Sequence, residues 1–177
     1  SMRKVLNYDD ASLLVETINS RNKALAQAVG DSNTLTTVNS LWIDQSMSFS
    51  KPYANTIQSL SNASAYSVDY KNAPTKAVAR INDWASKNTD GMITNLLKPN
   101  DVNPWTKLVL VNALYFKGTW KSPFALHETK EAPFYQDKDH QSSVLMMHQT
   151  NDFPYYVSED YQILDLPYQD ASLSMIV

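Results

Sequence analysis

"LVLVNALYFKGTW", residues 108–120, holds the features that decide how this sequence folds. Its branched and aromatic side chains predict one long strand over residues 106–120, too apolar to lie on the surface of a sheet. Asn112 interrupts the apolar run, and a buried amide without a hydrogen-bond partner costs roughly 1–3 kcal/mol. On the pattern alone, Asn112 marks either a bulge or edge position, or a polar lock that holds neighbouring strands in one arrangement.

Helices and strands are interleaved before this strand. A helix is predicted from Asp9 to Val29, with Gly30 ending it. The residues on its buried face are Leu14, Ile18, Leu25 and Val29. Residues 34–44 and 65–70 predict strands. Between them, Ser50 as N-cap and Pro52 in the first turn predict a short helix. Its buried face comprises Tyr53, Ile57 and Leu60.

A third helix is predicted from about Pro74 to Thr89, ended by Gly91. Its buried face comprises Val78, Ile81, Trp84 and Ala85, and its solvent side Lys76, Arg80, Asp83 and Lys87. After the long strand, the pattern predicts only short β segments, over residues 132–148, 152–157, 161–168 and 171–177. This order of elements indicates the α+β class. Because the chain stops inside the apolar run "SLSMIV", we expect it to be part of a larger folding unit.

The composition excludes several classes of protein. The 177 residues carry a net charge of −3, which fits one domain of ordinary size and argues against a broad nucleic-acid footprint. There is no cysteine, and no apolar run approaches the length of a membrane span. The three glycines are too scattered for a phosphate-binding loop, so we expect no nucleotide cofactor.

Enzymatic and metal sites are also unsupported. The three histidines, His127, His140 and His148, lack the spacing of a zinc site, and no serine lies in a G-x-S-x-G turn. One of Met146 and Met147 is expected to point inward on a strand and the other outward. We therefore expect neither a catalytic residue nor a metal ion.

Two surface features carry little weight. A sulfated polysaccharide could bind the basic residues of the first helix, but acidic residues dilute their charge and favour a mixed solvated face. The basic residues are Arg3, Lys4, Arg21 and Lys23. The glycosylation sequence Asn62-Ala63-Ser64 is short enough to arise by chance.

Several motifs, in order along the chain, resemble the serpins, the serine protease inhibitor superfamily. "LVNALYFKGTWKSPF" (110–124) is similar to the long central strand and following turn of that family. "VLMMHQ" (144–149) resembles its Met-Met strand, and "ILDLPYQDASLSMIV" (163–177) resembles its barrel strands. Upstream, "NSLWID", "SVDY" and "AVARINDWASKNTDGMITNLL" resemble two strands and the helix that crosses the main sheet. The resemblance covers essentially the whole chain.

The resemblance implies a partial serpin fold, with helices on a large central sheet followed by barrel strands. Residues 1–177 would form part of a single serpin domain, whose N-terminal helices and reactive loop lie outside this chain. Asn112 matches the asparagine of the shutter, midway along the main sheet, and Trp120 matches the tryptophan of the breach, where a cleaved loop begins to insert. Gly118 would allow the chain to bend between them.

The resemblance also implies an inhibitor rather than an enzyme. A serpin is a suicide substrate, which traps a serine or cysteine protease when its cleaved loop inserts into the sheet. The alternative is a non-inhibitory carrier, chaperone or storage protein with the same fold; an unrelated secreted β-rich binding domain is a further alternative. The expected partners are the target protease and the rest of the serpin chain. The expected location is extracellular, with the cytoplasm as the alternative.

Overall fold

The computed structural model describes residues 11–60, 62–170 and 172–177, which form two compact units. The sheet unit contains the residues up to Gln27 and Leu35–Phe116, and the hairpin unit contains Ala28–Thr34 and Lys117–Val177. The sheet unit contains α-helices and β-strands, and the hairpin unit contains β-strands and one short 3-10 helix, so the predicted α+β class is confirmed.

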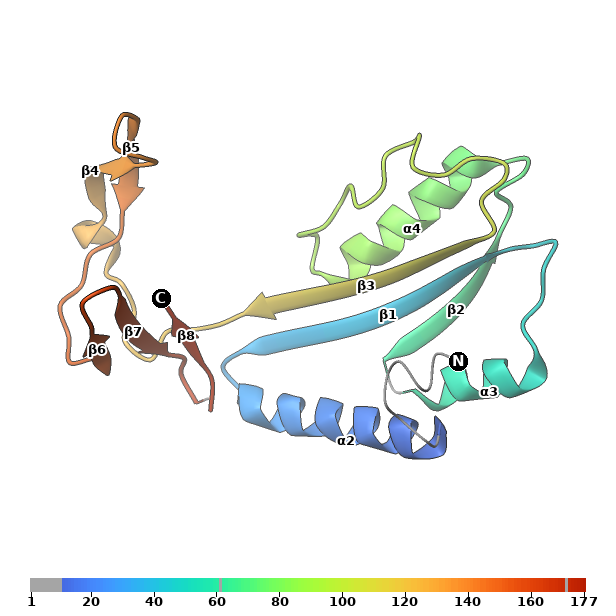
Figure 1. Cartoon of the computed structure of the whole chain (residues 1–177), viewed down its shortest axis with the longest axis horizontal. Coiled ribbons are helices and arrows are strands. Elements are labelled where there is room, and N and C mark those ends of the chain that lie inside the picture. Colours follow the sequence, from blue (N-terminus) through green and yellow to red (C-terminus); the bar gives the residue numbers. More distant parts are fainter. Residues whose placement is uncertain (1–10, 61, 171) are drawn as a thin grey trace. The chain divides into compact units, whose positions relative to one another are not determined.

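A three-stranded sheet in the order β2-β1-β3 forms the centre of the sheet unit (Figure 1). β1 and β2 are parallel, with Asn39 opposite Ala63 and Asp44 opposite Val68. The end of β1 lies beside the start of β3, since the Asp44 amide donates to the Lys107 carbonyl at 3.0 Å. The elements are α2 (Ala11–Val29), β1 (Thr34–Asp44), α3 (Lys51–Ser59), β2 (Ala63–Val68), α4 (Pro74–Asn88) and β3 (Leu108–Lys117).

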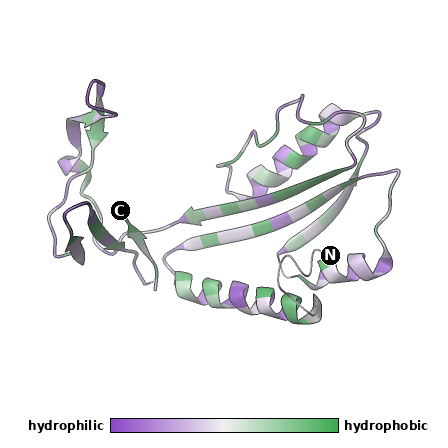
Figure 2. Cartoon of the chain, in the orientation of Figure 1, coloured by the Kyte–Doolittle hydropathy of each residue, from purple (hydrophilic) through white to green (hydrophobic). Residues whose placement is uncertain are grey.

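The core lies between the sheet and α4. Trp42 of β1 stacks on Tyr66 of β2, with ring centroids 4.3 Å apart, and meets Trp84 of α4 edge-on at 6.4 Å. The predicted inner face of α4 is confirmed in full, because all four of its residues are buried. Other members of this core are Val68, Tyr70, Ala77, Val102, Val111 and Ala113. Figure 2 shows the hydrophobic residues along β3.

The other two helices bury less than the pattern predicts. In α3, none of the described residues is buried, and Tyr53 is 44% exposed. A groove of about 580 Å³ lies between α3 and the sheet, so the apolar side of this helix stands away from the strands. A second groove, of about 570 Å³, lies between α2 and β1 and leaves Leu25 38% exposed. Ser50 precedes α3 as predicted, but its side chain makes no capping hydrogen bond.

The bounds of two strands and one helix before the hairpin unit differ from the predicted ones. The long strand covers Leu108–Lys117 and not residues 106–120, because the chain after Lys117 turns to other partners in the hairpin unit. β2 covers Ala63–Val68 and not residues 65–70, since the Gln45 amide pairs with the Val68 carbonyl at the last rung of the ladder. α4 ends at Asn88, one residue before the predicted Thr89.

The hairpin unit consists of short antiparallel strands. β4 and β5 form a hairpin in which Lys130 pairs with Met146 and Tyr135 pairs with Gln141. A second sheet has the order β6-β7-β8. The elements are η1 (Leu126–Glu128), β4 (Lys130–Tyr135), β5 (Gln141–Met146), β6 (Tyr155–Val157), β7 (Gln162–Pro167) and β8 (Ser174–Ile176). Met146 is half-buried and Met147 is 55% exposed, as the alternation predicts.

Candidate functional site

Asn112 joins two strands of the sheet by a side-chain hydrogen bond. Its Nδ2 donates to Oδ1 of Asn39 on β1 at 2.9 Å. The Asn39 amide in turn donates to the Asn62 carbonyl at 2.8 Å, just before β2. This chain of contacts crosses the sheet from β3 to the start of β2, so Asn112 provides an interstrand polar link.

The expectation that Asn112 is buried is wrong. Its neighbours Val111 and Ala113 are buried against the α4 side, and the strand's period of two places Asn112 on the opposite, exposed face. The same exposed face carries Leu110 and Leu114, at 67% and 59% exposure. Among the described strands, β3 is the last of the sheet, and Asn112 also makes the interstrand link, so the choice between an edge position and a polar lock stays a prediction.

Trp120 lies at the centre of an aromatic cluster in the hairpin unit. It pairs with Tyr168 in an isolated antiparallel bridge, and the two rings stack with centroids 4.6 Å apart and 11° between their planes. Phe124 meets the indole edge-on at 6.3 Å. Trp120 is half-buried, so the cluster anchors the chain after β3 to the end of β7.

The turn after α2 is tied to the same cluster. Oδ1 of Asn33 accepts from the Thr119 amide at 2.8 Å, and Nδ2 of Asn33 donates to the Gln169 carbonyl at 2.6 Å. Ser32 donates from its hydroxyl to Asp170 at 2.7 Å. No motif in the sequence had indicated a role for Ser32, Asn33 or Tyr168. The polar turn "GDSN" after α2 was the available signal, and Gly30 there has φ of +70°.

Gly118 lies between the end of β3 and the Trp120 cluster. Among the described glycines, a positive φ occurs at Gly30 and Gly91, and Gly118 is not one of them. Its backbone conformation is therefore open to any residue, and its role as a bending point stays a prediction.

The end of β1 holds a buried carboxylate, Asp44, which is 1% exposed. It accepts hydrogen bonds from the Ser46 amide at 3.1 Å, from the Ser46 hydroxyl and from the Tyr70 amide at 3.3 Å. The Lys107 ammonium lies 3.7 Å away. The pKa of Asp44 is lowered below its ordinary value of 3.8, mainly by the hydrogen bond from the Ser46 hydroxyl. Burial acts in the opposite direction, and the Ser46 and Tyr70 amides and the Lys107 charge lower the pKa further. Burial, and then the Asp44 charge, raises the pKa of Tyr70 to about 12.

The remaining candidate sites are weaker. The described residues contain no group of three or more metal-ligating side chains. No helix in the described ranges is both long enough and apolar enough to cross a membrane. Arg21 and Lys23 are exposed on α2, while Arg3 and Lys4 lie outside the described residues.

The chain is similar to known proteins along its whole length. A family model described as serpin (serine protease inhibitor) matches residues 1–177. The leukocyte elastase inhibitor of Xenopus tropicalis is 35% identical over 98% of this chain and 47% of its own length. That of Equus caballus is 39% identical over 98% of this chain and 46% of its own length.

Solved structures agree with the sequence matches. Emu ovalbumin superposes with a TM-score of 0.79 and 33% identity, covering 88% of this chain and 41% of ovalbumin. AtSerpin1 of Arabidopsis, in its native stressed conformation, gives 0.81 and 25% identity, covering 96% of this chain and 44% of AtSerpin1. The chain spans about half the length of the curated relatives it matches. The match over its full length, with these relatives and neighbours, shows that the chain belongs to the serpin family.

Proposed function

We propose that the protein containing this chain inhibits a serine protease as a suicide substrate and is not itself an enzyme. The observation that carries the proposal is the identity of 35–39% with proteins named leukocyte elastase inhibitor, over 98% of this chain. An elastase-type serine protease is accordingly the first target to test. A cysteine protease is the second target that the family resemblance implies.

In this proposal the chain supplies the sheet that receives the reactive loop. β3 is the terminal strand of the described sheet, so its outer backbone groups offer a template on which a further strand could pair. A solved structure of cleaved ovalbumin is described as loop-inserted, and it superposes on this chain with a TM-score of 0.76 and 27% identity. The loop itself is proposed to come from the rest of the serpin chain, which completes a single domain with residues 1–177.

The first prediction concerns the trapping of the protease. When the full-length protein is mixed with an elastase-type protease, the activity of the protease is expected to be abolished. A covalent complex of the two proteins should form and survive denaturing electrophoresis. A protease whose catalytic serine is replaced by alanine is the control, because it cannot form the acyl bond and should give no such complex. Cleavage of the protein by a protease that stays fully active would reject inhibition of that protease; the same result with a panel of serine and cysteine proteases would favour the carrier, chaperone or storage alternative.

The second prediction concerns the proposed shutter residue. Asn112→Ala removes the hydrogen bond to Asn39, so the full-length protein is expected to lose about 0.5–1.5 kcal/mol of stability. Spontaneous loop insertion or polymerisation is expected to rise, because the closed sheet is less favoured. Thermal unfolding and size-exclusion chromatography after incubation measure the two effects.

A matched control for this prediction is Asn95→Ala. Asn95 is also exposed, but its side chain donates a hydrogen bond to the neighbouring Thr94 hydroxyl, at 3.4 Å, and not to another strand. Wild-type stability of Asn112→Ala, with an unchanged inhibition stoichiometry, would count against the shutter assignment. Equal losses in both variants would show that the effect belongs to any exposed asparagine.

The location of the protein stays a prediction. An extracellular location is expected from the family resemblance, and the names of the relatives do not support it. The cytoplasm is the alternative.

A further inference from the structure

Asp44 connects all three strands of the sheet at one end. It is the last residue of β1, its carboxylate accepts from the Tyr70 amide two residues beyond β2, and its own amide donates to Lys107 immediately before β3. The Lys107 ammonium then adds an opposite charge 3.7 Å from the carboxylate. A single buried side chain therefore contacts the ends of β1 and β2 and the start of β3.

The interface between β1 and β3 is consequently uneven along its length. At the Asp44 end, the two strands are linked by the backbone hydrogen bond from the Asp44 amide to the Lys107 carbonyl and by the ion pair between their side chains, 3.7 Å apart, in which the carboxylate is buried. Five residues away on each strand, the side-chain link is one neutral, exposed hydrogen bond between Asn39 and Asn112. The side-chain link at the Asp44 end is therefore the charged one, and its carboxylate is held in place by hydrogen bonds from Ser46 and Tyr70.

We propose that Asp44 is the positioning residue that holds the start of β3 in the sheet. Its functional consequence rests on the proposed function, since a strand can pair beside β3 only while β3 itself is held against β1. Loss of the Asp44 carboxylate should remove the ion pair with Lys107 and loosen the start of β3, although such a variant still has the backbone amide of residue 44 that donates to the Lys107 carbonyl. Less of the protein would then complete loop insertion, and more would be consumed by the protease as ordinary substrate.

The charged form of Asp44 is the one that makes these contacts. The groups that face it are Lys107, Tyr70 and Asp69, and only Lys107 offers a stabilising charge. Asp69 is occupied by hydrogen bonds from the amide and side chain of Asn72. Because the folded-state pKa of Asp44 is lowered, its contribution to stability is present above its ordinary pKa of 3.8 and is lost as the pH falls through the folded value.

Ser46 supplies the sharpest test, because its hydroxyl is the first cause of the lowered pKa. In the full-length protein, the NMR shifts of the Ser46 and Tyr70 amides, followed against pH, report the titration of Asp44. Ser46→Ala is expected to move the midpoint to higher pH, and Lys107→Gln to move it in the same direction by less. Asp44→Asn is expected to remove the transition and to speed exchange of the Tyr70 amide about tenfold.

Asp137→Asn is the matched control. Asp137 is an exposed carboxylate in the β4–β5 turn whose pKa is also lowered, first by the Asp139 amide. This variant should leave the Tyr70 titration unchanged. Unchanged exchange of the residue 44 amide, which donates to the Lys107 carbonyl, in Asp44→Asn would overturn the proposal. Lys107→Gln, with the same amide as the readout, keeps the test informative where Asp44→Asn does not fold.

Inhibition assays separate this proposal from the proposed function. If Asp44 positions β3 and the protein is an inhibitor, the stoichiometry of inhibition should rise in Asp44→Asn: several times more of the variant should be required to inhibit one equivalent of protease. If the wild-type protein inhibits nothing, the proposed function fails, while exchange of the residue 44 amide still decides the role of Asp44. A normal inhibition stoichiometry in Asp44→Asn, with altered exchange at Tyr70, would reject its link to loop insertion.

Discussion

Replacing Trp42 with alanine is expected to destabilise the sheet unit by about 3–5 kcal/mol, the range for removing a fully buried aromatic side chain. Trp42 is 2% exposed and packs between Tyr66 and Trp84. Its Nε1 donates to the Ser40 hydroxyl at 2.8 Å, and the Arg80 guanidinium lies 5.8 Å from its ring centre. Alanine would leave a cavity beneath α4 and an unpaired Ser40 hydroxyl. Denaturant unfolding, followed by circular dichroism, measures the loss.

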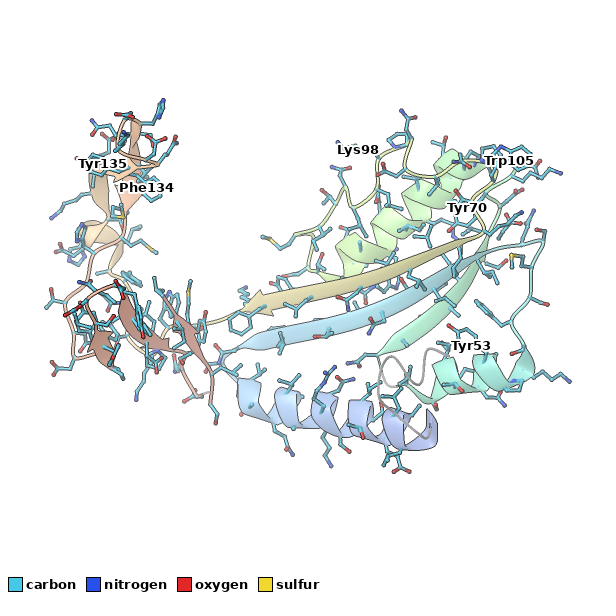
Figure 3. The ribbon with its side chains drawn as sticks, in the orientation of Figure 1. Tyr53, Tyr70, Lys98, Trp105, Phe134 and Tyr135 are labelled. Atoms are coloured by element: carbon cyan, nitrogen blue, oxygen red, sulfur yellow. The ribbon has the colours of Figure 1, made fainter. Side chains whose placement is uncertain are left out.

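Trp105→Ala is the control for this prediction. Trp105 lies in the segment before β3 and is 86% exposed (Figure 3). Removing it should change stability by less than about 0.5 kcal/mol. If the two variants lost similar amounts of stability, Trp42 would not be a central core residue.

Trp120→Ala is the second large effect, expected at about 2 kcal/mol. The value lies below the full aromatic range because Trp120 is only half-buried. About 1 kcal/mol of this loss should be coupling energy with Tyr168, since a stacked aromatic pair adds roughly 0.5–1.5 kcal/mol beyond the burial of its rings. A double-mutant cycle of Trp120→Ala and Tyr168→Ala measures this coupling. Coupling near zero would show that the 4.6 Å stack does not stabilise the cluster.

The proposed breach role adds a kinetic readout for Trp120. In the full-length protein, Trp120→Ala should change the rate of loop insertion after cleavage as well as stability, because the cluster would lie where insertion begins. Leu126→Ala is the control, since Leu126 is 88% exposed and lies in the same unit. Equal insertion rates in Trp120→Ala and wild type would leave Trp120 a structural residue and reject its assignment to the breach.

Local pattern predicted the elements best where burial is one-sided. β1 was predicted over the residues that form it, and the four residues of the α4 inner face are all buried. In α3 the same kind of reasoning was wrong, because helical periodicity shows which residues share a face and not whether a partner packs on it. Ile57, which was expected to be buried, lines a groove, and Tyr53 is 44% exposed.

Motifs in the sequence were enough to identify the family, the α+β class and the two candidate residues, Asn112 and Trp120. Motifs of this kind are local, so they can be recognised without knowing which segments meet. The three-dimensional fold was needed to show that Asn112 is exposed and bonded to Asn39, that Trp120 stacks on Tyr168, and that Asp44 contacts residues at the ends of three strands. These contacts join residues far apart in the chain: the Asn112–Asn39 bond spans 73 residues, and no local preference of either residue specifies its partner.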